Sequence, residues 1–480
     1  MGETRGSRGE NGRYHSNFRL KEREIILRWI RAGASGSVVG LAGAGKSNLI
    51  GYLCREQDIE EIEGLDGRSV VLVPVDLNDV PDNHIATFYR MILRSFHEVR
   101  WQFGGGLQET LSELYRQHRA VTDPFVLQSV LRELLLHLDD QYMQVVLVLD
   151  RFDDFCKLAE QAMANTLKGL RDSFKDTLCF LVGMRQEAAY VSTNDKLGEL
   201  RELVDAHICW VGPMSENDTR HMLQQQAEQL GRGLEEEQVA ELWRLTGGYP
   251  ALVRVASDWW RLEGYLQEIS VWEDILRHMP SLQHRLREIW DGIPPDEQNL
   301  LLEIQRIWLQ TAVVNMSNEE ICQSFAHLKQ QQSYLFRTLA TKGLCVCQPD
   351  QTWHLFSALF ADFVAANVER GYEEVCLDEE TSEIYQGKRP LSDLSNLERS
   401  VLTFFLENPR VKLTKDELIM NAWPKEVVEG ENVSDESLYQ VISALRRKIE
   451  PLRSKKPRYI VTWHGRGYQF FPNGQPNGEG

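Results

Sequence analysis

Residues 37–53 read SVVGLAGAGKSNLIGYL, in which a β-rich run passes through glycines into a helical pattern. Within this stretch, residues 40–47 match the pattern G-x-x-x-x-G-K-[ST] in full. In such a strand–loop–helix setting the glycines let backbone N–H groups converge on phosphates, and the helix N-terminus adds positive potential. The stretch therefore predicts a phosphate-binding loop, or P-loop.

The loop residues have distinct expected roles. Lys46 is placed to reach the β- and γ-phosphates of ATP or ADP, and Ser47 is placed to ligate Mg²⁺. The loop and the first turn of the following helix are expected to hold the nucleotide through Gly40, Gly43, Ala44, Gly45, Lys46, Ser47 and Asn48.

Two later segments supply further candidate partners for a bound triphosphate. Asp150 ends an apolar run and is expected to hold Mg²⁺ from the tip of a nearby strand. Asp153 and Asp154 follow it, and each either orients an attacking water or belongs to a solvated acidic loop. Arg185 closes another apolar run, where it is either a γ-phosphate sensor or an ordinary surface arginine. The expected catalytic set is Lys46, Asp150, Asp153, Asp154 and Arg185.

Strand-like runs alternate with helical patterns up to about residue 210. Residues 70–77, 144–150 and 178–185 are rich in apolar residues on both faces, which is typical of a parallel sheet between helices. The pattern then becomes helical, and residues 281–372 give helices followed by a hairpin. The sequence predicts an α/β P-loop NTPase fold, followed by a helical lid and two winged-helix domains.

Composition shifts and turn residues set the expected domain bounds. These are a flexible N-terminus at 1–16, the NTPase domain at 17–210, the lid at 211–280, a first winged helix at 281–372, a linker with at most a short strand at 373–392, a second winged helix at 393–473 and a flexible tail at 474–480.

Overall composition narrows the function classes. The formal charge of −18 argues against non-specific coating of nucleic acid, so any DNA-binding surface has to be a local basic patch. Residues 1–15 lack the apolar core of a signal peptide, and no apolar run reaches the roughly 20 residues of a membrane helix. The eight cysteines show neither zinc nor disulfide spacing. We expect a cytoplasmic protein with reduced thiols and no membrane partner.

Three helices and a hairpin are marked in the last domain. Ser395 and Thr414 open capping boxes, and Ser434 is a third candidate N-cap. Two strand-like runs then flank glycines at 465 and 467, as in a tight hairpin. The core face of the third helix is expected at Leu438, Ile442, Leu445 and Ile449.

The same segment concentrates positive charge. From Gln440 to Tyr468, eight basic residues stand against one acid, Glu450. A patch at the end of an exposed helix and on a wing is what phosphate contacts require, although a solvated basic face is the alternative.

The P-loop, the segment VLVLDRFDD, the strand ending at Arg185 and residues 246–250 (TGGYP) together resemble the STAND class of signal-transduction ATPases, relatives of the AAA+ class. The resemblance covers about residues 17–370. It implies that Gly248 and Pro250 pack on the adenine side of the nucleotide. It also implies a phosphate-binding histidine in the first winged helix, for which His354 is the candidate; a core-facing histidine is the alternative.

The sequence departs from AAA+ relatives in two respects that bear on catalysis. Arg151 stands where many of them carry a glutamate, and no arginine stands out as a finger acting on a neighbouring subunit, so slow hydrolysis is expected. STAND proteins usually carry sensor repeats, and no repeats of 20–50 residues are visible in this sequence.

Residues 413–470 resemble the OmpR/PhoB-type winged helix, above all in ALRRKIEP and in the wing RYIVTWHGRGY. In that family the third helix enters the major groove of double-stranded DNA and the wing contacts backbone or minor groove. Val441 and Ala444 replace frequent base-reading residues, so readout of bases is expected to be weak or to rest on Gln440 and thymine methyl contacts. The resemblance implies DNA contacts from Gln440, Ser443, Arg446, Arg447, Thr462, His464 and Arg466.

Three functions fit these features. The first is an ATP/ADP-controlled transcription regulator that forms an ATP-dependent homo-oligomer and responds to a protein or small-molecule inducer. The second is an AAA+ DNA-loading ATPase similar to replication initiators or transposition regulators. The third is a nucleotide-driven defence switch whose winged helix binds protein. The OmpR/PhoB-type domain favours the first.

Overall fold

The computed structural model describes residues 17–55, 64–77, 82, 84–158, 161–191, 197–228, 233–314, 316–368, 374–378, 383–387, 389–423, 434–450, 457–463 and 465–474. Its chain divides into two compact units. The first comprises Met1–Ile293, Phe336–Cys347 and Leu355–Phe360, and the second comprises Pro294–Leu335, Gln348–His354 and Ala361–Gly480.

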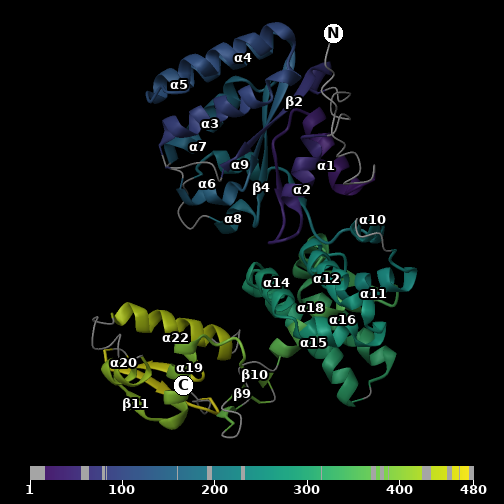
Figure 1. The fold of residues 1–480 in the computed structure, drawn as a ribbon, viewed down its shortest axis with the longest axis vertical. Coiled ribbons are helices and arrows are strands. Elements are labelled where there is room, and N and C mark those ends of the chain that lie inside the picture. Colours follow the sequence, from purple (N-terminus) through teal and green to yellow (C-terminus); the bar gives the residue numbers. More distant parts are fainter. Residues whose placement is uncertain are drawn as a thin grey trace. The chain divides into compact units, whose positions relative to one another are not determined.

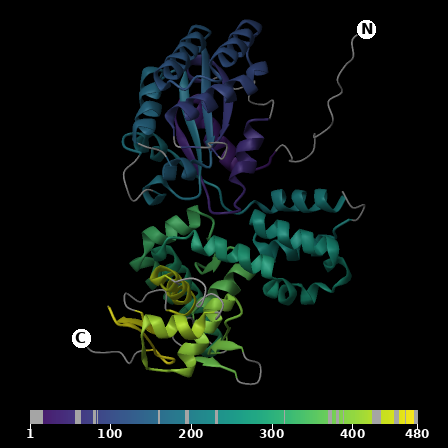
Figure 2. The same cartoon turned by 60° about the vertical axis from the view of Figure 1, so that its left-hand side comes forward.

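A five-stranded sheet forms the centre of the N-terminal part of the first unit, with helices on both sides (Figures 1 and 2). The strand order is β2-β3-β4-β1-β5 and all pairings are parallel. This arrangement confirms the predicted fold class. The strands are β1 (Gly36–Val39), β2 (Ser69–Asp76), β3 (Met143–Asp150), β4 (Leu178–Met184) and β5 (Ile208–Trp210).

Sheet burial follows from the apolar runs seen in the sequence. All residues of β4 are buried, and in β3 only the terminal Asp150 is not. Strands covered on both faces need side chains that are apolar on both faces, which explains the absence of alternation. The surrounding helices are α1 (Leu20–Arg31), α2 (Lys46–Leu53), α3 (Ile85–Glu98), α4 (Gly105–His118), α5 (Pro124–Asp140), α6 (Phe152–Leu158), α7 (Gln161–Ser173), α8 (Ala188–Val191) and α9 (Leu200–Asp205).

Among the described residues between the sheet and residue 293, the regular elements are helices. Helix α11 ends at two successive glycines, Gly247 and Gly248, whose φ values of 57° and 73° lie in the left-handed region. Such a C-terminal stop favours glycine because other residues pay a steric cost there. The helices are α10 (Glu216–Glu228), α11 (Glu236–Thr246), α12 (Pro250–Leu262), α13 (Trp272–His278) and α14 (Pro280–Asp291).

The next segment has the expected order of helices followed by a hairpin. Ser317 forms a capping box with Glu320 at the start of its second helix. The elements are α15 (Pro295–Val314), α16 (Asn318–Gln331), α17 (Ser333–Thr341), β6 (Cys345–Cys347), β7 (Trp353–Leu355) and α18 (Ala358–Val368).

The C-terminal domain is a winged helix. Both capping boxes predicted from the sequence are present, at Ser395 and Thr414. The four core residues predicted on the third helix are all at most 1% exposed. Strands β11, β13 and β12 form an antiparallel sheet in that order. The elements are α19 (Asn396–Glu407), β11 (Lys412–Leu413), α20 (Lys415–Ala422), α22 (Asp435–Ile449), β12 (Ile460–Trp463) and β13 (Gly467–Phe470).

A second small sheet precedes these helices, where the sequence predicted a linker. Strands β8 (Val375–Leu377), β9 (Ile384–Gln386) and β10 (Arg389–Pro390) pair antiparallel. Val375 and Ile384 are buried in the same core as Phe405 and Ile449. The described part of residues 373–392 therefore packs into the core of the C-terminal domain. Each strand is too short for a periodic pattern to show in the sequence.

Within the described residues, every helix is too short or too polar to cross a membrane.

Candidate functional site

The P-loop connects the end of β1 to the start of α2, and glycines make its shape possible. Gly43 and Gly45 have φ values of 76° and 91°, which other residues rarely adopt. A Cβ atom on Gly40 would lie 2.4 Å from the carbonyl oxygen of Val211. Ser47 and Asn48 are exposed at the first turn of α2. The loop therefore has the conformation that leaves backbone donors and the helix N-terminus for phosphate.

The Lys46 side chain is folded back onto its own loop. Its Nζ donates hydrogen bonds to the carbonyl oxygens of Gly40 and, at 3.3 Å, Leu41. Burial lowers the pKa of Lys46 to about 8, an effect that the nearby Asp153 and Asp150 oppose and that Arg185 adds to. The structure thus brings four of the five candidate catalytic residues into one electrostatic neighbourhood.

Asp150 lies at the C-terminal end of β3, beside β4. A Cβ atom on Gly183 of β4 would lie 2.5 Å from Asp150 Oδ1, so the glycine leaves the space that this carboxylate occupies. The same oxygen accepts a hydrogen bond of 2.9 Å from the backbone N–H of Arg151, whose φ is 58°.

Magnesium is compatible with this site. It prefers hard oxygen ligands, usually one or two from the protein with the rest from phosphates and water. The Ser47 hydroxyl and the Asp150 carboxylate are oxygen donors of that kind, at the start of α2 and the end of β3.

Asp153 is a buried link between α6 and the end of β4. Both of its carboxylate oxygens accept from the backbone N–H of Arg185, at 3.0 and 2.9 Å. Burial raises the pKa of Asp153, and these hydrogen bonds together with Lys46 oppose the rise. Asp153 therefore fixes the backbone that carries Arg185, whose side chain is exposed. Asp154 is half-buried next to it.

The helical lid rests directly on the P-loop. The Tyr249 hydroxyl donates to the carbonyl of Ala42 at 2.8 Å, and the Ala251 N–H donates to the carbonyl of Gly43 at 3.2 Å. A Cβ atom on Gly43 would lie 2.5 Å from the Ala251 Cβ, so the two backbones approach as closely as glycine allows. Sequence reasoning missed Tyr249 and Ala251 because such contacts have no local signal.

The two lid residues expected near adenine occupy different positions. A Cβ atom added to Gly45 would lie 3.4 Å from Pro250 Cγ, so Pro250 borders the P-loop. Gly248 packs within the lid, where a Cβ atom would lie 2.2 Å from Trp243 and 2.7 Å from the carbonyl oxygen of Met214.

His354 belongs to the second unit. Its ring lies 4.4 Å from that of Trp308, centroid to centroid, and its Nε2 is 3.3 Å from Thr352 Oγ1. Burial lowers the pKa of His354, so the neutral ring is favoured.

The pKa of Lys46 gives a pH prediction. Bound phosphates favour the ammonium form and raise this pKa, so above pH 8 binding has to take up a proton. The affinity for ADP should therefore fall roughly tenfold between pH 7 and pH 9. Isothermal calorimetry at pH 8.5 in buffers of different ionisation enthalpy should show proton uptake. An affinity for ADP that does not change with pH, together with no proton uptake, would contradict this prediction.

The expected DNA-contacting residues divide into two groups in the structure. Gln440, Arg447 and Arg466 are exposed, whereas Ser443 and Thr462 are half-buried. His464 lies outside the described residues, as do Arg453, Lys455 and Lys456 of the basic cluster.

Arg446 holds the wing against α22, a structural role that the sequence did not reveal. Its guanidinium donates to the carbonyl oxygen of Ile460 at 3.0 and 2.6 Å and to Thr462 Oγ1 at 2.7 Å. Burial lowers the pKa of Arg446. Lys448 is likewise engaged, with Glu398 and the carbonyl oxygen of Asp393. Arg446 therefore fastens α22 to the wing, and Arg447 and Arg466 are exposed charges of this surface.

A cleft of about 390 Å³ separates the third helix from the wing. It combines cationic and aromatic side chains, three of which sequence reasoning missed: Lys415, Tyr439 and Trp463. Lys412 Nζ lies 3.5 Å from the Trp463 ring centroid, so the cation covers one face of the indole. The lining residues are Lys415, Tyr439, Arg446, Thr462, Trp463, Gly465, Gly467 and Tyr468.

Two sequence families match the chain. The family described as Novel STAND NTPase 1 matches residues 19–347. The family described as Transcriptional regulatory protein, C terminal, matches residues 388–470. No curated protein matches the sequence.

Several solved structures are similar at low identity. The Aeropyrum pernix ORC2 protein in its ADPNP–ADP complexes is 15% identical, with a TM-score of 0.39, over 75% of this chain and 95% of its own. A Walker-type ATPase of Pyrococcus abyssi is 11% identical, with a TM-score of 0.42, over 74% and 99%. The RstA DNA-binding domain of Klebsiella pneumoniae, in complex with the RstA box, is 23% identical, with a TM-score of 0.18, over 21% and 95%.

Proposed function

Because the chain belongs to the Novel STAND NTPase 1 family and continues into a transcription-regulator DNA-binding domain, we propose that it is an ATP/ADP-controlled switch that regulates transcription. The nucleotide state decides how the C-terminal winged helix is presented to DNA. The observation that carries this proposal is the presence of both domains in one chain.

The P-loop supports the nucleotide half of the proposal. ATP and ADP differ by a γ-phosphate, and a switch requires groups whose contacts depend on it. Lys46 can leave its carbonyl partners for bound phosphate, and Arg185 is held beside it through Asp153. Mg²⁺ held by Ser47 and Asp150 would neutralise phosphate charge. The lid contacts on Ala42 and Gly43 let a change in loop position reach α12.

Slow hydrolysis fits this use of ATP as a state marker. The residue after Asp150 is Arg151, which provides no general base. Asp153 is the buried acid with the stronger effect on the pKa of Lys46, and both of its carboxylate oxygens already accept from the backbone N–H of Arg185. The ATP-bound state has to last long enough to control transcription, which requires slow hydrolysis of ATP. We propose that the ATP-bound protein assembles into a homo-oligomer.

The wing supports the DNA half of the proposal. Arg447 on α22 and Arg466 on the wing are exposed, and neighbouring backbone is fixed by Arg446. Phosphate contacts from fixed elements set register on a duplex, and the exposed Gln440 is the residue that we propose reads a base edge.

Selection of bound fragments from the source genome tests the function. The full chain should enrich discrete promoter fragments, with binding that falls steeply as salt rises. Long ATP-dependent coating of DNA would support the DNA-loading alternative. Absence of binding to any fragment at low salt would support the protein-binding alternative.

A further inference from the structure

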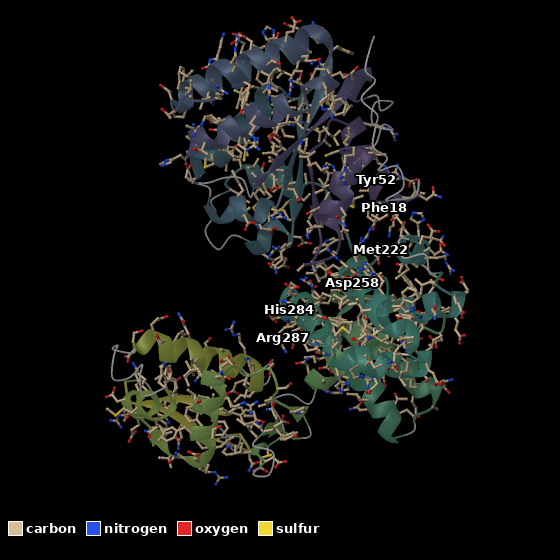
Figure 3. All side chains as sticks on the ribbon, viewed as in Figure 1. Phe18, Tyr52, Met222, Asp258, His284 and Arg287 are labelled. Atoms are coloured by element: carbon tan, nitrogen blue, oxygen red, sulfur yellow. The ribbon has the colours of Figure 1, made fainter. Side chains whose placement is uncertain are left out.

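Arg19, at the start of α1, is a buried arginine beside the P-loop. Its side chain is 1% exposed and its backbone adopts a left-handed conformation, with φ 50° and ψ 38°. A non-glycine residue in that conformation is uncommon and persists where its surroundings fix it. The preceding Phe18 is buried against Tyr52 of α2, with ring centroids 5.5 Å apart, and Figure 3 shows the two rings together. The entry to α1 is therefore held against the P-loop helix.

The Arg19 side chain joins the P-loop to the beginning of the lid. Its Nη2 donates to the carbonyl oxygen of Ala44 at 2.9 Å, and its Nη1 donates to the carbonyl oxygen of Pro213 at 3.3 Å. Its backbone N–H lies 3.4 Å from Asp218 Oδ1, on α10. One residue thus contacts the loop that binds phosphate and two successive points of the lid.

The charge of Arg19 is placed where it helps an anion to bind. A guanidinium stays protonated at every physiological pH. Its Nη2 would lie 3.7 Å from a Cβ atom on Gly45, directly before Lys46. Glu22 pairs with it at 3.0 Å, and the buried Asp218 is held by Ser215. Removing Arg19 would leave Glu22 and Asp218 without the cation that now lies between them and the P-loop.

The Nε of Arg19 is buried and has no hydrogen-bond partner among the described residues. Buried donors of native proteins are nearly always satisfied, so an unpaired one marks a place where water or a ligand atom is expected.

We propose that Arg19 is a positioning residue that clasps the lid to the P-loop and holds the loop in its phosphate-binding shape. Nucleotide affinity and lid closure then depend on the same side chain. The expected effect of Arg19 on ADP affinity rests on the proposed nucleotide binding, but its effect on the lid can be measured without nucleotide.

The test compares wild type with Arg19→Ala, with Arg28→Ala as the matched control. Arg28 lies on the same helix and is exposed. Hydrogen exchange of a peptide covering residues 250–255 reports the lid, because the Ala251 N–H donates to the P-loop. We expect exchange at least tenfold faster in Arg19→Ala without nucleotide, with strands β3 and β4 unchanged. Calorimetry with ADP and Mg²⁺ should show affinity reduced tenfold or more, and Arg28→Ala should match wild type in both measurements.

Unchanged exchange of the lid peptide in Arg19→Ala would overturn the proposal. If wild type binds no ADP but the lid peptide still exchanges faster in Arg19→Ala, the proposed nucleotide function fails and the positioning role of Arg19 is retained. Should Arg19→Ala not fold, Arg19→Lys decides, since lysine retains the charge but cannot bond Ala44 and Pro213 with one planar fork. Wild-type lid exchange in that variant would likewise contradict the role assigned to Arg19.

Discussion

Replacing Lys46 by alanine should lower the affinity for ADP and Mg²⁺ by about 100-fold or more. Its ammonium is buried beside the loop and gains charge-assisted hydrogen bonds to phosphate, each of which contributes about 1.5–3 kcal/mol. The apo protein should not be destabilised by the same substitution, because burial already works against the charged form, as the lowered pKa shows.

Thermal unfolding with and without ligand separates these effects. At ADP concentrations of about 100 times the dissociation constant, wild type should gain about 2.7 kcal/mol, and Lys46→Ala should gain almost nothing. Lys175→Ala is the matched control, because Lys175 is exposed before β4. Equal stabilisation of the Lys46 variant by ADP would show that this loop does not bind phosphate.

The second large effect is expected on DNA. Arg447→Ala should weaken binding of a selected fragment by about 1–3 kcal/mol, which is roughly 5- to 150-fold, and Arg447→Ala with Arg466→Ala should abolish the gel shift. Both side chains are exposed, and neither makes a hydrogen bond or an ion pair with another of the described residues. Arg446→Ala is a poor probe of DNA contact, because it would also free the wing strand that Arg446 holds.

The salt dependence identifies the kind of contact. Loss of one phosphate contact should reduce the slope of log K against log salt by about 1. Arg410→Asn is the matched control, since it removes one exposed charge from the same domain and asparagine tolerates the left-handed φ of 64° there. If the Arg447 variant binds DNA with the affinity and the salt slope of wild type, DNA does not contact this part of the domain.

The sequence predicted those parts of the molecule that local patterns specify. The P-loop could be recognised because its glycines are required by φ values that other residues avoid. The core face of α22 could be recognised because Leu438 and Ile442 repeat with the helical period. The parallel sheet was visible from valine-rich runs without alternation.

The parts that were missed depend on contacts between distant segments. Arg19 meets Ala44, 25 residues away, and Pro213, 194 residues away, and neither contact leaves a local signal. Arg446 reads as a DNA-contacting arginine in a basic run, yet its guanidinium is satisfied by Ile460 and Thr462. The strands β8 to β10 were missed because two or three residues are too few for a pattern.

The central claim is that the nucleotide state of one half of the chain controls DNA binding by the other half. Fluorescence anisotropy with a selected promoter fragment tests it directly, using the full chain with Mg²⁺ and either ATP or ADP. The account predicts at least a fivefold difference in affinity between the two nucleotides, within the usual range of coupling between sites, and no difference in Lys46→Ala. Identical affinity with ATP, ADP and no nucleotide in wild type would contradict it.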